Sequence, residues 1–180
     1  LICGGFTKEE TENALIDLNF LNINNVLALR GDAASFDGRF VPDPNGHEFA
    51  LDLVKQIDGM NQGRYLDDNI KDGLKTEFCI GVAGYPEKHF EAPNLASDLT
   101  FTKAKVDAGA NYIVTQMFFD NKHYFSYVEE CRKAGIDVPI VPGLKPLTKL
   151  HQLSSIPRHF YIDLPDDLVT APMGRAGTPE

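Results

Sequence analysis

The chain has 180 residues, of which 43% are hydrophobic and 24% are charged, so its composition is that of an ordinary globular protein. Collagen, coiled coil and wholly disordered chains are excluded, and no stretch approaches the ~20 consecutive apolar residues that span a membrane. The formal net charge of −9 argues against a nucleic-acid partner, because binding to a phosphate backbone needs clustered Lys and Arg. Cys3, Cys79 and Cys131 lie too far apart for a metal-binding motif, and we expect a reduced, cytoplasmic protein.

The first half of the chain alternates between patterns typical of strands and of helices. Thr7 and Glu10 have the spacing of a capping box, in which each side chain bonds the backbone N–H of the other residue, and they predict the start of a helix. Apolar residues then recur at helical spacing, whereas later runs are continuously apolar and indicate buried strands. The expected elements are a strand within 1–7, a helix over 8–21, a strand over 25–30, a helix over 47–60 and a strand over 78–84.

The second half continues this alternation, with clear signals at the helix ends. Gly109 and Gly135 each follow a helical pattern and are expected at its carboxyl-terminal cap. Asp120 is expected to cap the amino terminus of a helix. The expected elements are a helix over 95–108, a strand over 112–119, a helix over 121–134, a strand over 139–144 and a short helix over 147–153.

Continuously apolar strands that alternate with helices predict an α/β fold with a parallel sheet covered by helices. Two topologies fit this order: an open doubly wound sheet, and part of a (β/α)8 TIM barrel. Polar residues follow the carboxyl ends of successive strands, where a barrel builds its active site, and no G-x-G-x-x-G sequence follows any strand. We therefore expect part of a (β/α)8 barrel, with about five of its eight strands present.

Candidate ligand-binding residues follow the first two apolar strands. Arg30 offers a planar fork for an anion, Gly31 allows close backbone approach, and Asp32 brings a negative charge that can tune a cofactor. Tyr85 and His89 follow the small residues Ala83 and Gly84, which leave room for a flat ring. The alternatives are an ion pair with a turn at the first strand end, and an ordinary rigid loop at the second.

Further candidates lie within the predicted helices and the third strand. Asp98 and Lys105 are seven residues apart and lie on one helical face. This face is either a solvated surface with ion pairs, or it directs the lysine at a diphosphate. Gln116 places an amide in an apolar strand, where it needs a protein or ligand partner, because an unsatisfied buried amide costs about 1 to 3 kcal/mol. Gln152, in the last short helix, either covers a pocket or is an ordinary surface glutamine.

Several segments occur in an order and with a spacing that point to one family. They are LALRGD at 27–32, VAGYPEKH at 82–89 followed by Glu91 and Ala92, KVDAGA at 105–110, TQMFFD at 115–120, CRKAGI at 131–136 and PIVPGL at 139–144. Together they closely resemble the methylenetetrahydrofolate reductase family, in its bacterial FAD-dependent form, over residues 1–170.

This resemblance implies an activity and a cofactor. The family folds as a (β/α)8 barrel that holds FAD and reduces 5,10-methylenetetrahydrofolate to 5-methyltetrahydrofolate. NAD(P)H gives a hydride to the flavin, and folate then takes it. The resemblance implies a small-molecule substrate, a homo-oligomer and neither a nucleic-acid nor a membrane partner, and it does not choose between NADH and NADPH.

The resemblance also implies roles for individual residues. Asp32 corresponds to the carboxylate that modulates the flavin, and it is expected to be catalytic together with Gln116. Gln116 and Gln152 match positions that contact folate and the nicotinamide donor. The positions that match FAD contacts are Arg30, Gly31, Asp32, Phe49, Ala50, Ala83, Tyr85, His89, Ala92, Asp98 and Lys105. No metal site is implied.

The chain also departs from the family pattern. The glutamate that serves the family as general acid is expected upstream of Leu1, so we expect a piece of a longer protein. Residues 1–170 would then form an incomplete flavin-binding reductase domain, with an irregular tail over 171–180. Two alternatives remain open: a flavin-free barrel enzyme that acts on a phosphorylated substrate, and a non-catalytic pseudo-enzyme that binds ligand.

Overall fold

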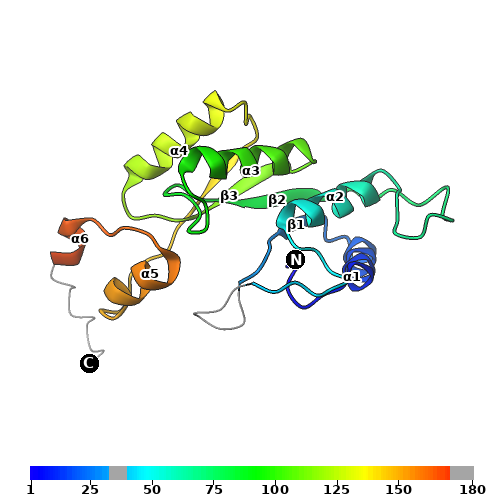
Figure 1. The fold of residues 1–180 in the computed structure, drawn as a ribbon, viewed down its shortest axis with the longest axis horizontal. Helices are drawn as coiled ribbons and strands as arrows, with labels where there is room; N and C mark the ends of the chain where they lie inside the picture. The colour runs from blue at the N-terminus through cyan, green and yellow to red at the C-terminus, as the bar shows by residue number, and fades with distance from the viewer. Residues whose placement is uncertain (33–39, 171–180) are drawn as a thin grey trace.

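The structure is a computed structural model that describes residues 1–32 and 40–170. The tail expected over 171–180 therefore lies outside the described residues. Helices and strands alternate along the chain as predicted (Figure 1). In order they are α1 (Lys8–Phe20), β1 (Asn25–Ala28), α2 (Ala50–Asn61), β2 (Cys79–Gly84), α3 (Leu95–Asp107), β3 (Tyr112–Met117), α4 (Asn121–Lys133), β4 (Ile140–Gly143), α5 (Gln152–Phe160) and α6 (Asp166–Thr170).

The strands form one parallel sheet in the order β1-β2-β3-β4, which confirms the α/β fold and fits part of a TIM barrel. Within the described residues the sheet has four strands. The segment 1–7, which was also expected to contain a strand, makes two isolated bridges, a parallel one from Ile2 to Leu29 and an antiparallel one from Thr7 to Gly46. The Cys3 N–H donates to the Leu29 carbonyl at 3.0 Å, but the chain then turns away at Gly5, whose φ of +76° is incompatible with a strand.

The predicted helix ends are confirmed by their hydrogen bonds and backbone angles. The Thr7 hydroxyl accepts from the Glu10 N–H, and the Glu10 carboxylate accepts from the Thr7 N–H, which completes the capping box. The Asp120 carboxylate accepts from the Lys122 N–H at 2.8 Å at the start of α4. Gly109 and Gly135 follow α3 and α4 with φ of +118° and +74°, which glycine adopts without a steric cost.

The C-terminal helices differ from the prediction. The short helix expected over 147–153 is wrong in its bounds, because α5 begins only at Gln152, and the following helix α6 was not foreseen. The side-chain carbonyl of Gln152 explains the late start. It accepts from the backbone N–H groups of Thr148 and Lys149, at 2.7 and 2.8 Å, and so holds residues 149–151 as a turn before the helix.

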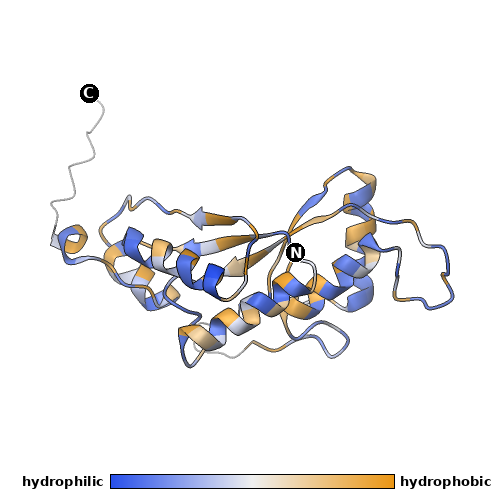
Figure 2. Ribbon diagram, turned by 90° about the horizontal axis from the view of Figure 1, so that it is seen from above, coloured by the Kyte–Doolittle hydropathy of each residue, from blue (hydrophilic) through white to orange (hydrophobic). Residues whose placement is uncertain are grey.

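The core lies between the sheet and α2, α3 and α4, and hydrophobic residues concentrate along the strands (Figures 1 and 2). Fully buried side chains include Leu53 and Ile57 of α2, Ile80 of β2, Ile113 of β3 and Tyr127 of α4. Burial of each of the aliphatic ones contributes about 1.5 to 3 kcal/mol, so these contacts fix the strand ends that carry the candidate site. No described helix is both long and apolar enough to cross a membrane.

Candidate functional site

A cavity of about 260 Å³ opens at the carboxyl ends of β1, β2 and β3. Parallel strands place these ends at one edge of the sheet, so residues far apart in the sequence meet there. The wall is apolar where Leu27, Leu29 and Val114 line it, and the rest is largely polar. The lining residues are Leu27, Leu29, Arg30, Gly31, Asp32, Ala83, Tyr85, His89, Val114, Thr115 and Gln116. Most of the predicted site residues therefore lie together.

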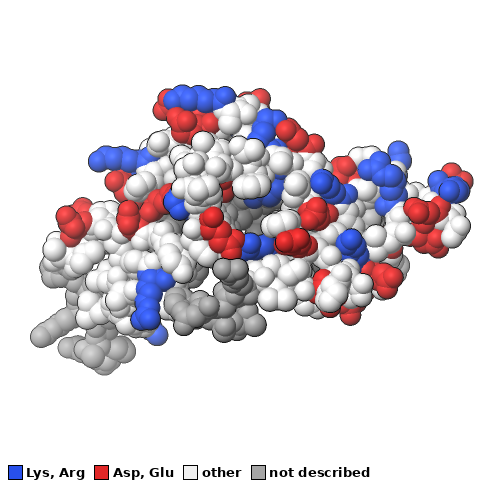
Figure 3. Space-filling view, viewed as in Figure 1, with Lys and Arg blue, Asp and Glu red and all other residues white. Residues whose placement is uncertain are grey.

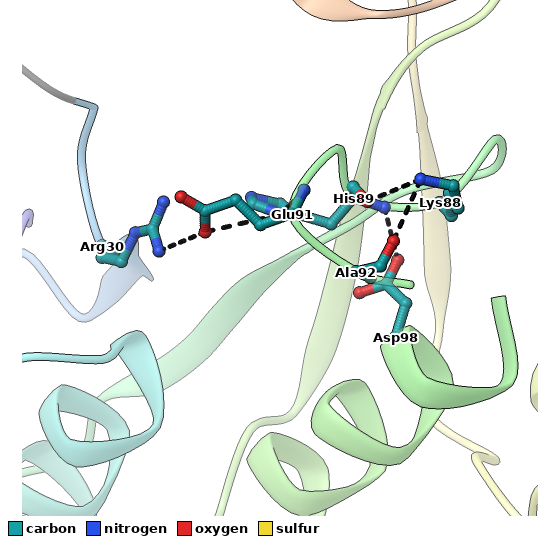
Figure 4. A network of polar contacts seen from close by, with 6 residues as sticks. All are labelled: Arg30, Lys88, His89, Glu91, Ala92 and Asp98. Atoms are coloured by element: carbon teal, nitrogen blue, oxygen red, sulfur yellow. Dashed lines mark hydrogen bonds and ion pairs between the residues drawn. The ribbon is translucent and has the colours of Figure 1, made fainter. Parts of the chain in front are cut away.

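The segment after β1 supplies a fixed cation and an exposed carboxylate. Gly31 has a φ of +88°, so the chain turns sharply at a position where other residues would be strained. The Arg30 guanidinium donates to the Glu91 carboxylate at 2.6 Å (Figure 4). It also lies 5.2 Å from the centre of the Phe40 ring, a cation–π distance. Asp32 is exposed at the rim of the cavity. The ion pair that was the alternative interpretation of this strand end thus exists, but its acid comes from a different loop.

The loop after β2 supplies the rings of Tyr85 and His89, and burial favours the uncharged form of both. The Tyr85 and His89 rings meet edge to face, with centres 4.6 Å apart. Burial, followed by the charges of Asp98 and Asp32, raises the pKa of Tyr85 to about 12, so its hydroxyl keeps its proton at neutral pH. Burial lowers the pKa of His89, and its Nδ1 faces the Glu91 N–H at 3.2 Å. A neutral His89 that accepts at Nδ1 carries its proton on Nε2, which can donate to a ligand.

Helix α3 places Asp98 and Lys105 underneath this loop, where Asp98 is buried and Lys105 is half-buried. The Asp98 carboxylate accepts from the His89 N–H at 2.8 Å, and burial raises its pKa (Figure 4). The Lys105 ammonium donates to the Ala83 carbonyl at 2.8 Å, and burial lowers its pKa to about 8. The alternative of a solvated surface for this pair is therefore wrong, since Lys105 holds the backbone at the end of β2 and Asp98 holds the backbone of the loop that follows.

Gln116 lies where β3 and β4 lose their regular pairing. The register between these strands shifts between Val114 and Met117, and the Gly143 N–H donates to the Thr115 hydroxyl at 2.9 Å instead of to a strand carbonyl. The Gln116 side chain is half-buried and lines the cavity, and its carbonyl accepts from the Met117 N–H at 3.0 Å. Among the described residues its amide NH2 group makes no hydrogen bond, which leaves that group for a ligand.

The remaining predicted residues do not line this cavity. Phe49 lies on a neighbouring cavity of about 430 Å³, which shares Arg30 with the first. Ala50 is the first residue of α2, and buried Ala92 accepts from the Lys88 ammonium at 3.0 Å (Figure 4). Gln152 is engaged with the turn before α5, so its expected contact with a ligand stays a prediction.

Sequence reasoning did not single out Glu91, Phe40 and Thr115. Glu91 was noticed only as part of a family segment, although it binds Arg30 across 61 positions of sequence. Its one local signal is its place two residues after His89 in the same loop. Phe40 also contacts Arg30, and Thr115 bonds the neighbouring strand, so all three support predicted residues.

The loop after β2 also holds the C-terminal part of the described chain. The Glu87 carboxylate accepts from the Asp163 N–H at 2.7 Å, and burial raises the pKa of Glu87. The Phe90 and Tyr161 rings stack with centres 4.9 Å apart. These contacts tie the segment between α5 and α6 to the loop that carries Tyr85 and His89.

Replacement of Lys105 by methionine should change how stability depends on pH. The lysine pKa is 10.5 when exposed and about 8 in the folded chain, so between these values the folded state has released a proton that the unfolded state still holds. The folded wild-type chain therefore gains stability as pH rises through this window, relative to Lys105→Met. Urea unfolding of both proteins below and above about pH 8 measures the difference. Lys103→Met, which removes the more exposed ion pair with Asp107, is the control, and parallel profiles for Lys105→Met would contradict the assignment.

The chain is similar in sequence to a known protein family. A sequence profile of the family described as methylenetetrahydrofolate reductase matches residues 1–173. The chain belongs to this family. It is 36% identical over 170 residues to methylenetetrahydrofolate reductase 2 of Saccharomyces cerevisiae, with 89% of this chain and 26% of that protein covered. It is 33% identical over 180 residues to the 5,10-methylenetetrahydrofolate reductase of Pectobacterium carotovorum subsp. carotovorum, with 100% of this chain and 53% of that protein covered.

A solved structure shares the fold of this chain. The structure is that of an uncharacterized protein from Clostridium thermocellum that binds two copies of 5-methyl-5,6,7,8-tetrahydrofolic acid. It matches 96% of this chain and 52% of its own, with a TM-score of 0.55 and 14% identity. The chain thus spans between about a quarter and about half of the length of the relatives it matches.

Proposed function

We propose that the whole protein reduces 5,10-methylenetetrahydrofolate to 5-methyltetrahydrofolate, with NAD(P)H as donor and bound FAD as carrier. The observation that carries this proposal is the cavity at the ends of β1, β2 and β3, in a chain of the methylenetetrahydrofolate reductase family. The related fold that binds 5-methyl-5,6,7,8-tetrahydrofolic acid supports folate as substrate. The free cysteines, Cys3, Cys79 and Cys131, fit a cytoplasmic location, and a homo-oligomer stays a prediction.

The residues of the cavity fit a flavin. Leu27 and Leu29 form an apolar wall, and the small side chain of Ala83 on the adjacent strand leaves room for a flat heterocycle. The amide NH2 of Gln116, which has no partner among the described residues, and the Nε2–H of His89 supply hydrogen-bond donors. Arg30 supplies positive charge for an anionic group. Lys105 and Asp98 would hold FAD indirectly, by fixing the strand end and loop that line the cavity. Bound FAD supplies a two-electron carrier that accepts and returns a hydride.

Each polar residue then has a definable role. Asp32 places a negative charge at the rim and would make reduction of a bound flavin less favourable by repelling the added charge. Burial raises the pKa of Tyr85 to about 12, so its hydroxyl keeps its proton. Tyr85 therefore lines the cavity as a hydrogen-bond donor and not as a base. Gln116 would orient folate or nicotinamide through its amide NH2, which has no partner among the described residues. Gln152 would contact a ligand through its own NH2, because only its side-chain carbonyl is engaged in the turn before α5.

Absorbance of the purified whole protein tests the proposal. We expect a bound flavin spectrum that is bleached by NADH or NADPH without oxygen and restored by 5,10-methylenetetrahydrofolate. A colourless protein that binds phosphate esters would instead support the flavin-free barrel enzyme. A flavin that binds but is never bleached by either donor would support the non-catalytic pseudo-enzyme.

A further inference from the structure

Arg30 carries the only side-chain cation that lines either cavity within the described residues. The nearby Lys105 is half-buried and engaged with the Ala83 carbonyl, and His89 is neutral because burial lowers its pKa. An anionic group of a ligand in this region therefore has Arg30 as its charged partner. The face drawn in Figure 3 shows no broad basic surface that could take its place, because Lys and Arg are interspersed with Asp and Glu.

That cation is already neutralised by a carboxylate of the same chain. Glu91 accepts from the Arg30 guanidinium at 2.6 Å, and these two residues come from the loops that follow β1 and β2 (Figure 4). Glu91 lines the second cavity together with Arg30, so the pair lies where the two cavities adjoin. An anionic ligand group that approaches Arg30 must share it with Glu91 or displace Glu91.

Glu91 is the partner that can move. The Arg30 side chain is only 21% exposed and packs on the Phe40 ring, whereas the Glu91 side chain is 44% exposed. The Glu91 backbone is held by its N–H bond to His89 Nδ1, so its carboxylate can turn away while its position in the loop is kept. Within the described residues no other acid pairs with Arg30, so removal of Glu91 leaves the cation free for ligand.

We propose that Glu91 is an internal competitor for Arg30 that sets the affinity of the site for the diphosphate part of its ligand. The proposal rests on the proposed function, in which that ligand is FAD. It assigns Glu91 a specificity role: a ligand binds at Arg30 only when its anionic group is a better partner for the guanidinium than a carboxylate is. A diphosphate, with more charge and more acceptor oxygens, meets this condition, and an uncharged ligand gains nothing from it.

The test compares Glu91→Gln with wild type in the whole protein after removal of bound flavin. Affinities for FAD and for riboflavin, which lacks the diphosphate, are measured by quenching of flavin fluorescence. We expect Glu91→Gln to bind FAD about fivefold more tightly, the effect of one partly exposed ion pair, and riboflavin with unchanged affinity. Glu129→Gln is the matched control, because Glu129 pairs with Lys133 on α4 and lines neither cavity.

The outcomes separate this inference from the proposed function. If wild type binds FAD and Glu91→Gln binds it equally or more weakly, Glu91 does not compete and the inference is overturned. An equal gain for FAD and riboflavin also overturns it, because Glu91 would then act on the shape of the cavity. If wild type binds neither flavin, the proposed function itself fails. Thermal unfolding of each variant verifies that it is folded before affinities are compared.

Discussion

Replacement of Gln116 by alanine should lower the folate-dependent turnover of the whole protein about 10- to 100-fold, while its flavin content changes little. The substitution removes the amide NH2 that has no partner among the described residues, and with it a hydrogen bond to substrate. Stability should fall only slightly, because the one protein bond lost is that from the Met117 N–H. Turnover by steady-state kinetics and flavin content by absorbance, measured on the same samples, check both parts.

Gln116→Glu separates the two hydrogen-bonding roles of this side chain. It keeps an oxygen that can accept from the Met117 N–H and removes the NH2 donor. If the donor acts on substrate, Gln116→Glu loses folate turnover as Gln116→Ala does. If Gln116 only supports the backbone at the irregular end of β3, Gln116→Glu is as active as wild type and Gln116→Ala loses flavin and turnover together.

Local signals in the sequence predicted the elements and most of the cavity. The capping box at Thr7, the cap at Asp120 and the glycines after α3 and α4 act through bonds within a few residues, so the sequence pattern contains them. The cavity was predicted for a topological reason. Parallel strands bring their carboxyl ends to one edge, so polar residues after successive strands must meet.

Contacts between distant segments were not predictable. The alternative for Arg30 was an ion pair at the end of its strand, but its acid, Glu91, is 61 positions away, and only the pairing of β1 with β2 brings the two loops together. Asp98 and Lys105 satisfied the spacing of an exposed face equally well, because helical periodicity gives the face and not what covers it. The role of Gln152 was not predictable either, since its side chain stabilises a turn that replaces the first part of the predicted helix.

The shift in register between β3 and β4 is a further feature without a sequence signal, and it predicts an unusually severe effect for one small substitution. A Cβ atom at Gly143 would lie 2.0 Å from the Thr115 carbonyl oxygen. That oxygen belongs to the backbone next to Gln116, so relief of the clash must separate the strands or displace the peptide that carries the amide. Overpacking of an interior costs about 1 to 3 kcal/mol and more where backbone must move, so we expect Gly143→Ala to cost about 3 kcal/mol or more.

In a domain of this size that loss lowers the melting temperature by about 6 to 12 °C, and differential scanning calorimetry of the whole protein measures it. Gly59→Ala is the matched control. A Cβ atom at Gly59 in α2 would meet the Arg64 carbonyl at an ordinary 3.6 Å, so removal of a helix glycine should instead raise stability by about 0.5 to 1 kcal/mol. The same chemical change thus has opposite signs at two positions. Equal melting temperatures for Gly143→Ala and wild type would mean that β4 does not approach Thr115 this closely, and the support assigned to Gln116 would have to come from elsewhere.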